Sequence, residues 1–395
     1  MEAHPSGVLV PPGYGPLLDS ATEVLRADDR VQAAWVHGSL ARSEGDALSD
    51  LDVIVAVADD SLTEFGAGWR NRLAAITPTV MARRFFGDGG SWLSITPSCQ
   101  RFDFWVEAAS GVATSMVNDR HLLFDRAGLA ALVPPPLPPA DPSPEKFAQL
   151  RDWYAACAAV VATDPEPLLC IEVMHTLRWI LYEAYVEANR PLPVKSVKRW
   201  SAKLTAAQRD LLVALPSEGD PALVMAALDD ALGPLVDELP DPSLGRVVMP
   251  PEGMLRGVYL PSEPAEARAR HVVDEFFAIH LYLTLVIHRD DWLLGHDGIN
   301  YLRRVLYELD LEQNGRAAAT EPSDWAARLS DDQHGELLAL PTGPPTPDGV
   351  IDGHRAVRVT FVERGHALLG DDWPSDLEHA VCTRVDEHVD AFRSL

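Results

Sequence analysis

The chain has 395 residues, more than a single compact core usually holds, so we expect two or three domains. Hydrophobic residues make up 47% and charged residues 23%, ordinary proportions that exclude wholesale disorder and fibrous repeats. With 33 Lys and Arg against 59 Asp and Glu, the net charge of −26 excludes a long basic surface and disfavours nucleic acid as a partner. Such acidity attracts cationic small molecules, or serves solubility alone.

The cysteines and the first residues indicate a location. Four scattered cysteines with no CxxC pair are typical of small core residues in a reducing compartment: Cys99, Cys157, Cys170 and Cys382. Residues 1–5 carry neither a basic nor an apolar signal region, and we see no run near the roughly 20 apolar residues that span a bilayer. We therefore expect a cytoplasmic protein without a membrane partner.

Residues 1–133 are predicted to form an α/β domain with a mixed sheet. Helical spacing of apolar residues predicts helices over Pro16–Arg26 and Leu62–Ile76. Short apolar runs between turn residues predict strands over Val31–Val36, Leu51–Val57, Ser91–Thr96 and Phe102–Val106. The proline-rich run that begins at Pro134 fits neither a helix interior nor a central strand, so we place the domain boundary just before it.

Beyond the prolines the hydrophobic period becomes helical. We expect a helical domain over residues 145–310 and a helical extension over 320–395, which makes the whole fold α+β. Helices are predicted over Pro144–Thr163, Pro167–Asn189, Thr205–Leu215, Pro221–Leu239, Ala265–Ile287 and Ser375–Phe392. Residues 312–350 are polar and rich in proline, which predicts a loop or linker between the last two segments.

The stretch from residue 35 to 55 carries the chemistry. An apolar strand leads into Gly38 and Ser39, a polar turn follows, and a second strand opens with Asp50 and Asp52. Residues i and i+2 of a strand project to one face, so these two carboxylates point side by side. Neighbouring like charges are costly unless a hard divalent cation joins them, which predicts Mg²⁺. Gly38 lets the backbone approach an anion closely, and Ser39 adds a hydroxyl, so this turn can cradle a phosphate.

Gly38-Ser39 followed after a turn by Ser49-Asp50-x-Asp52-Val53 resembles the signature of the DNA polymerase β-like nucleotidyltransferases. It looks most like the aminoglycoside and lincosamide adenylyltransferases, although Ser43 stands where many members have glycine. The resemblance implies transfer of AMP from ATP to a hydroxyl of a small cationic molecule such as an aminoglycoside. It also implies two Mg²⁺ ions, and nucleotide contacts from Gly38, Ser39, Arg42 and Ser49.

The family pattern calls for a third carboxylate on a neighbouring strand. In the run from residue 100 to 107, Phe102, Phe104 and Val106 alternate onto one face. The opposite face receives Arg101, Asp103, Trp105 and Glu107. We choose Asp103, which either completes the metal site or takes the proton of the attacking hydroxyl. Glu107 is the reserve candidate, with a role in substrate binding.

The helical domain offers further candidates. Glu183 and Trp179 share a helix face that suits a cationic sugar, and Glu183 is also a possible base; the alternative is ordinary helix packing. Lys195 and Lys198 follow in a local basic cluster, where they bind the nucleotide phosphates or form a solvated helix start. We expect the acceptor to bind between the two domains.

Other functions fit parts of the same pattern. A lone Asp-x-Asp is common, since aspartate also caps turns. The same residues can belong to an enzyme that transfers AMP to a protein, as antitoxin-like relatives do, or to a non-catalytic regulator that binds nucleotide. The size of the helical domain argues against the first and the complete set of acids against the second. The oligomeric state is left open.

Overall fold

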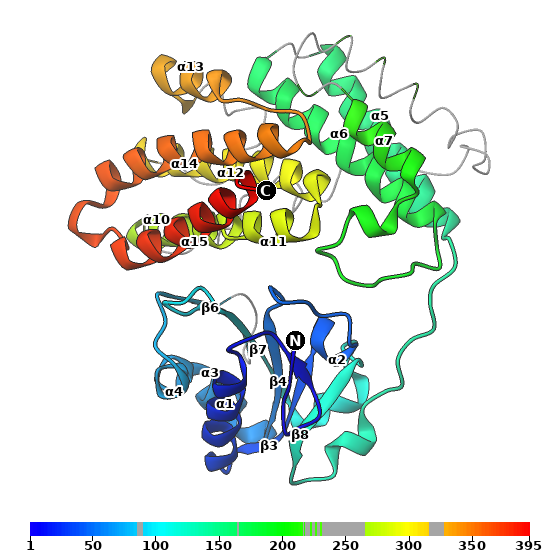
Figure 1. The fold of residues 1–395 in the computed structure, drawn as a ribbon, viewed down its shortest axis with the longest axis vertical. Helices are drawn as coiled ribbons and strands as arrows, with labels where there is room; N and C mark the ends of the chain where they lie inside the picture. The colour runs from blue at the N-terminus through cyan, green and yellow to red at the C-terminus, as the bar shows by residue number, and fades with distance from the viewer. Residues whose placement is uncertain are drawn as a thin grey trace. The chain divides into compact units, whose positions relative to one another are not determined.

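The computed structural model describes residues 1–84, 90–163, 166–215, 265–315 and 328–395, together with residues 217, 222, 226 and 230. The chain divides into two compact units, Met1–Pro138 with Pro374–Asp386 and Pro139–Trp373 with Glu387–Leu395. The first, the N-terminal unit, holds a six-stranded mixed sheet, and the second, the helical unit, is mainly helical (Figure 1). The predicted α+β fold class is thus confirmed.

The sheet of the N-terminal unit has the strand order β5-β6-β7-β4-β3-β8. Strands β4 and β7 run parallel, and the other neighbours are antiparallel. The four predicted strands are confirmed, and two edge strands join them: β3 Val31–His37, β4 Leu51–Val57, β5 Met81–Arg84, β6 Ser91–Ile95, β7 Arg101–Ala108 and β8 Arg120–Asp125. A separate pair, β1 Glu2–Ala3 and β2 Leu9–Val10, lies near the start of the chain.

Three helices cover one face of this sheet: α1 Gly15–Ala27, α3 Leu62–Ala67 and α4 Trp69–Ile76 (Figure 1). Trp69 is fully buried against Phe104, with ring centroids 4.2 Å apart. Burying one such side chain contributes about 2 to 3 kcal/mol, so this face forms the main core of the unit. The single helix predicted over 62–76 is in fact divided at Gly68.

The opposite face is covered only in part. Trp35 and Ile54, in the middle of β3 and β4, pack against Val112 and Leu129 from two short 3₁₀ turns. This smaller cluster lies over the central strands. The residues of β7 on the same face, described below, are the ones that carry the candidate site.

The helical unit is built around one long helix. Helix α12 packs against α10, α14 and α6, and α5 packs against α6. The helix predicted over 265–287 is divided at Leu281, and the one predicted over 221–239 lies outside the described residues except for residues 222, 226 and 230. The helices are α5 Pro144–Thr163, α6 Pro167–Ala188, α7 Ala206–Ala214, α10 Ala265–His280, α11 Tyr282–Arg289, α12 Trp292–Gln313, α13 Asp331–Ala339, α14 Pro347–Leu369 and α15 Ser375–Arg393.

Two segments bear on the remaining expectations. Within the described residues, Ala267–Arg289 is long and apolar enough to cross a membrane, but 72% of its most apolar window is buried in the structure, as in the core of a helical bundle. Helix α15 confirms the helix predicted over Ser375–Phe392 and buries Leu377, Val381, Val385 and Val389. Its residues are divided between the two units, so the C-terminal segment 320–395 contributes to both.

Candidate active site

Three aspartates converge on one face of the sheet. Asp50 directly precedes β4, Asp52 lies on β4, and Asp103 lies opposite Asp52 on the parallel strand β7. Each offers a carboxylate oxygen, and these oxygens all lie within 4.8 Å of one another. The sequence-based prediction that these side chains meet is confirmed, and we call them the acidic triad. The arrangement can hold a metal ion.

The chemistry of the triad favours a hard cation. All three ligands are carboxylates, the ligand type that Mg²⁺, Ca²⁺ and Mn²⁺ prefer, whereas softer metals prefer sulfur and nitrogen ligands. Asp50 is only 8% exposed, so its charge is poorly solvated. Arg101 lies 3.9 Å from Asp103, but three carboxylates so close together in a partly buried place still favour further positive charge beside them. A divalent ion therefore fits the triad better than water does.

The chain next to Asp52 has room for glycine alone. Gly38 opens the short helix α2, Gly38–Ala41, and adopts a positive φ of 71°. A Cβ atom built on it would lie 2.3 Å from the Oδ2 atom of Asp52, which is a collision. The backbone of the Gly38-Ser39 turn therefore lies directly against the triad, as a loop that brings phosphate to a metal would require.

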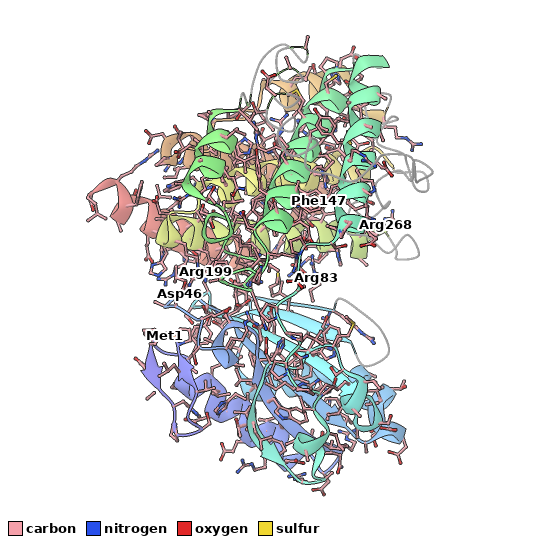
Figure 2. The ribbon with its side chains drawn as sticks, turned by 90° about the vertical axis from the view of Figure 1, so that its right-hand side faces the viewer. Met1, Asp46, Arg83, Phe147, Arg199 and Arg268 are labelled. Atoms are coloured by element: carbon pink, nitrogen blue, oxygen red, sulfur yellow. The ribbon has the colours of Figure 1, made fainter. Side chains whose placement is uncertain are left out.

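The turn between β3 and β4 is held by its own polar side chains. Ser49, 1% exposed, accepts a hydrogen bond at 2.9 Å from the backbone N–H of Asp46. Figure 2 labels Asp46. Arg42 donates to Glu44 at 2.9 Å and lies 3.8 Å from Asp119. These contacts shape the turn, and direct nucleotide contacts from Arg42 and Ser49 stay predictions.

Two titratable side chains beside the triad were missed at the level of sequence. Burial lowers the pKa of His37 to about 4 despite the opposing charge of Asp50, so its imidazole is neutral at pH 7. Burial, together with the charges of Asp50 and Asp103, raises the pKa of Tyr14, whose hydroxyl accepts a hydrogen bond at 2.9 Å from the backbone N–H of Arg101. No short motif marks Tyr14, whereas His37 directly precedes Gly38 and so belongs to the loop that resembles the nucleotidyltransferase signature.

Glu107 lies on β7, two residues beyond Trp105 and four beyond Asp103. Its carboxylate is paired with Arg120 at 2.5 Å, and the side chain of Arg120 is 1% exposed and 4.9 Å from the ring centroid of Trp35. A role for Glu107 in substrate binding would require this buried ion pair to open. That role stays a prediction.

The other predicted site residues belong to the helical unit. Trp179 stacks on Trp153 with centroids 6.3 Å apart. Glu183 lies 3.8 Å from Lys146, yet burial raises the pKa of its carboxyl. Lys195 is exposed, and the ammonium of Lys198 lies 5.2 Å from the ring centroid of Tyr282. The chemistry of these side chains allows each predicted role, and each role stays a prediction.

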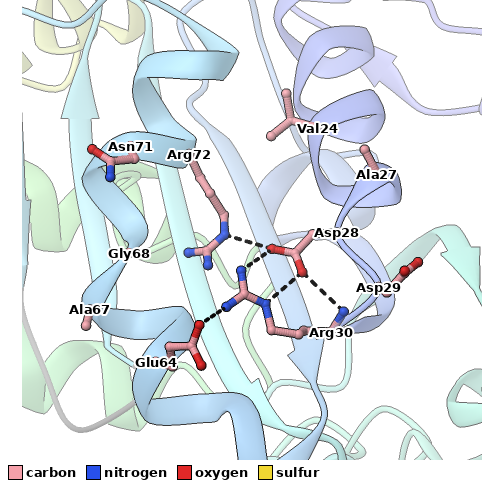
Figure 3. Close-up of a pocket in the computed structure, with 10 residues that line it drawn as sticks. All are labelled: Val24, Ala27, Asp28, Asp29, Arg30, Glu64, Ala67, Gly68, Asn71 and Arg72. Carbon is pink, nitrogen blue, oxygen red and sulfur yellow. Dashed lines mark hydrogen bonds and ion pairs between the residues drawn. The ribbon is translucent and has the colours of Figure 1, made fainter.

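A recess of about 750 Å³ lies at the other end of β3 from the triad, between α1 and the helices α3 and α4 (Figure 3). Asp28 accepts hydrogen bonds from Arg30 at 2.8 and 2.9 Å and from Arg72 at 3.0 Å. These arginines lower the pKa of Asp28 to about 2. Arg30 also pairs with Glu64 at 2.8 Å. The charges satisfy one another, as in a structural ion-pair network.

Comparison with known proteins decides nothing further. No family model matches this sequence, and no curated protein matches it either. The nucleotidyltransferase resemblance therefore rests on the residues from 35 to 57 and on the geometry of the acids.

Proposed function

We propose that the protein is a metal-dependent nucleotidyltransferase that moves AMP from ATP to a hydroxyl of a small cationic acceptor such as an aminoglycoside. The observation that carries the proposal is the convergence of the acidic triad against the Gly38-Ser39 turn. Each part alone is common, but a three-carboxylate site next to a glycine turn matches the needs of nucleotide transfer. The cytoplasm remains the expected location.

In this proposal Asp50 and Asp52 hold two Mg²⁺ ions, with Asp103 as a shared ligand or as the base. Bound Mg²⁺ would neutralise charge on the α-phosphoryl group and acidify the acceptor hydroxyl. The N–H groups of the Gly38-Ser39 turn bind the departing pyrophosphate, and their fixed position stabilises its charge. Catalysis then consists mainly of positioning and electrostatic stabilisation.

The charge of the chain supports a cationic acceptor. A net charge of −26 raises the local concentration of cations around the protein. Glu183 is the candidate from the helical unit for binding an amine or for removing a proton, because its raised pKa brings it nearer to the range of a general base. Lys195 and Lys198 are the candidates there for phosphate contacts.

Incubation with α-labelled ATP, Mg²⁺ and a panel of aminoglycosides, lincosamides, proteins and RNA tests the proposal. We expect pyrophosphate release and label transfer with small cationic acceptors alone, and loss of both when the metal is chelated. Label on protein would favour the protein AMP-transferase. ATP binding without any turnover would favour the non-catalytic regulator, and absence of ATP binding would contradict the assignment of the triad.

A further inference from the structure

Trp105 is an exposed aromatic side chain on the strand that carries Asp103. It is 41% exposed, although it lies within an eight-residue strand whose alternate residues Phe102, Phe104 and Val106 are buried. Asp103 and Trp105 project from the same face of β7, about 7 Å apart along the strand. An exposed indole leaves apolar surface in contact with water, which is unfavourable for the fold. Two residues along the strand from Asp103, it can instead bind the apolar face of a ligand.

The sheet order determines which reactant lies over Trp105. The Gly38-Ser39 turn follows β3, Asp52 lies on β4, and Asp103 and Trp105 lie on β7, in the order β7-β4-β3. In phosphoryl transfer the attacking and leaving oxygens lie in line on opposite sides of phosphorus. If pyrophosphate leaves toward the turn beside β3, the acceptor hydroxyl must attack from the side of β7.

The neighbours of Trp105 also restrict the chemistry of the occupant. In register with Trp105 are Ser91 on β6 and the buried Ile54 on β4, and next along the strand is Glu107, already neutralised by Arg120. The surface thus consists of the flat indole ring of Trp105, with the acidic triad at one end of it. A sugar ring stacks on such an indole through its apolar face, and an amine on that sugar gains cation–π attraction and the field of the triad.

We propose that Trp105 is the platform on which the sugar ring of a cationic acceptor stacks, so that Trp105 selects aminosugars over other hydroxyl compounds. This inference rests on the proposed nucleotidyltransferase function. It assigns Trp105 to the acceptor rather than to the base of ATP, because in-line attack places the acceptor on the β7 side.

The test compares Trp105→Ala, Trp105→Phe and Leu122→Ala with the wild type, using an aminoglycoside panel as the probe. Leu122 is a matched control, since it is 42% exposed on the edge strand β8 of the same sheet. We expect Trp105→Ala to raise the KM for aminoglycosides about tenfold, Trp105→Phe to raise it about twofold, and Leu122→Ala to leave it unchanged. The KM for ATP should stay the same in all three variants.

Two further measurements keep the inference separate from the proposed function. Calorimetric titration of Mg·ATP into the wild type tests the function, and its failure would remove the basis for both. If the wild type transfers AMP to an aminoglycoside, an unchanged acceptor KM in Trp105→Ala overturns the inference alone. A rise confined to the KM for ATP also overturns it, because Trp105 would then stack on the adenine base.

Discussion

Acidic side chains are buried in both units, but against different partners. In the N-terminal unit Asp50, Asp52 and Asp103 gather against one another within 4.8 Å. On helix α12 of the helical unit, Glu312 instead accepts two hydrogen bonds from Arg268, at 3.0 and 2.9 Å. The charge of Glu312 is balanced by one guanidinium, whereas the triad gathers three carboxylates at one point, with the guanidinium of Arg101 3.9 Å from Asp103, and keeps a repulsion that a bound cation would relieve. Burial of charge by itself therefore does not mark a site; the sign of the neighbouring charge does.

Asp52→Asn should have the largest effect, and it should act on activity and not on stability. We expect AMP transfer to fall about 10³-fold, because one ligand of the proposed metal is lost. The melting temperature should stay the same or rise, since the substitution removes one of the mutually repelling charges. Kinetic assays and thermal unfolding of the same preparation check both statements. Turnover at the wild-type rate would refute the metal assignment.

Glu312→Gln should have the opposite pattern, a loss of stability with no change in activity. It leaves the largely buried Arg268 without its ionised partner, so we expect the free energy of unfolding to fall by about 3 kcal/mol. The KM values should be unchanged. Glu64→Gln is the matched control, because Glu64 pairs with Arg30 at 2.8 Å but is 81% exposed, and such a pair contributes about 0.5 kcal/mol. Equal losses in urea titrations of the two variants would contradict this distinction.

Acid should weaken the helical unit through a buried histidine. Burial holds the pKa of His354 at about 4, against 6.5 when the side chain is solvated. The unfolded chain therefore binds more protons below pH 6.5, and the stability due to neutral His354 is lost as the pH falls from about 6.5 to about 4, at most about 3 kcal/mol. His354→Gln should flatten this part of the stability profile measured by urea titration. The exposed His379→Gln should leave the profile unaltered.

Comparing Gly38→Ala with Gly128→Ala separates the effect of contact with the triad from the effect of backbone strain. Gly128 has a similar φ of 73° but nothing within 4 Å of an added Cβ, so Gly128→Ala reports the strain alone. We expect Gly128→Ala to cost about 1 kcal/mol in unfolding experiments, and Gly38→Ala to cost more because its Cβ also meets Asp52. Only Gly38→Ala should lower AMP transfer, by about 10²-fold, because the turn must move away from Asp52. Equal activity in the two variants would remove the turn from the site.

Asp28→Asn should lower the stability of the N-terminal unit. The pKa of Asp28 is about 2 in the fold and 3.8 when the side chain is solvated, so its contribution is complete above about pH 4 and is lost toward pH 2. At neutral pH we expect a loss of about 2 kcal/mol. Asp29→Asn, at a fully exposed neighbour 3.8 Å from Arg126, should have no measurable effect in the same denaturation assay.

Much of the N-terminal unit could be predicted from the sequence. Strands β3, β4 and β7 are uninterrupted or alternating apolar runs, and the i, i+2 spacing of Asp50 and Asp52 determines that both face one way. The parallel register that sets Asp103 beside Asp52 follows once β4 and β7 are neighbours. Tyr14 and the collision at Gly38 depend on long-range packing, and no local pattern encodes them.

Helix α12 was not predicted, for a physical reason. It packs against several neighbouring helices, so most of its residues are buried, polar and charged ones included. Its buried positions include His296, Asn300, Arg303, Asp310 and Glu312, which resemble surface residues in the sequence. Helix α13 fell inside the expected loop over 312–350, although Ser330 and Gln333 form a capping box that the sequence displays as S-x-x-Q.

The division of helix α15 bears on how the protein is made. Residues Pro374–Asp386 complete the N-terminal unit, yet the ribosome synthesises them after Pro139–Trp373 of the helical unit. Domains usually fold as their residues emerge, N-terminal first. Here the N-terminal unit is whole only after residues 374–386 have been made, more than 230 residues after its sheet.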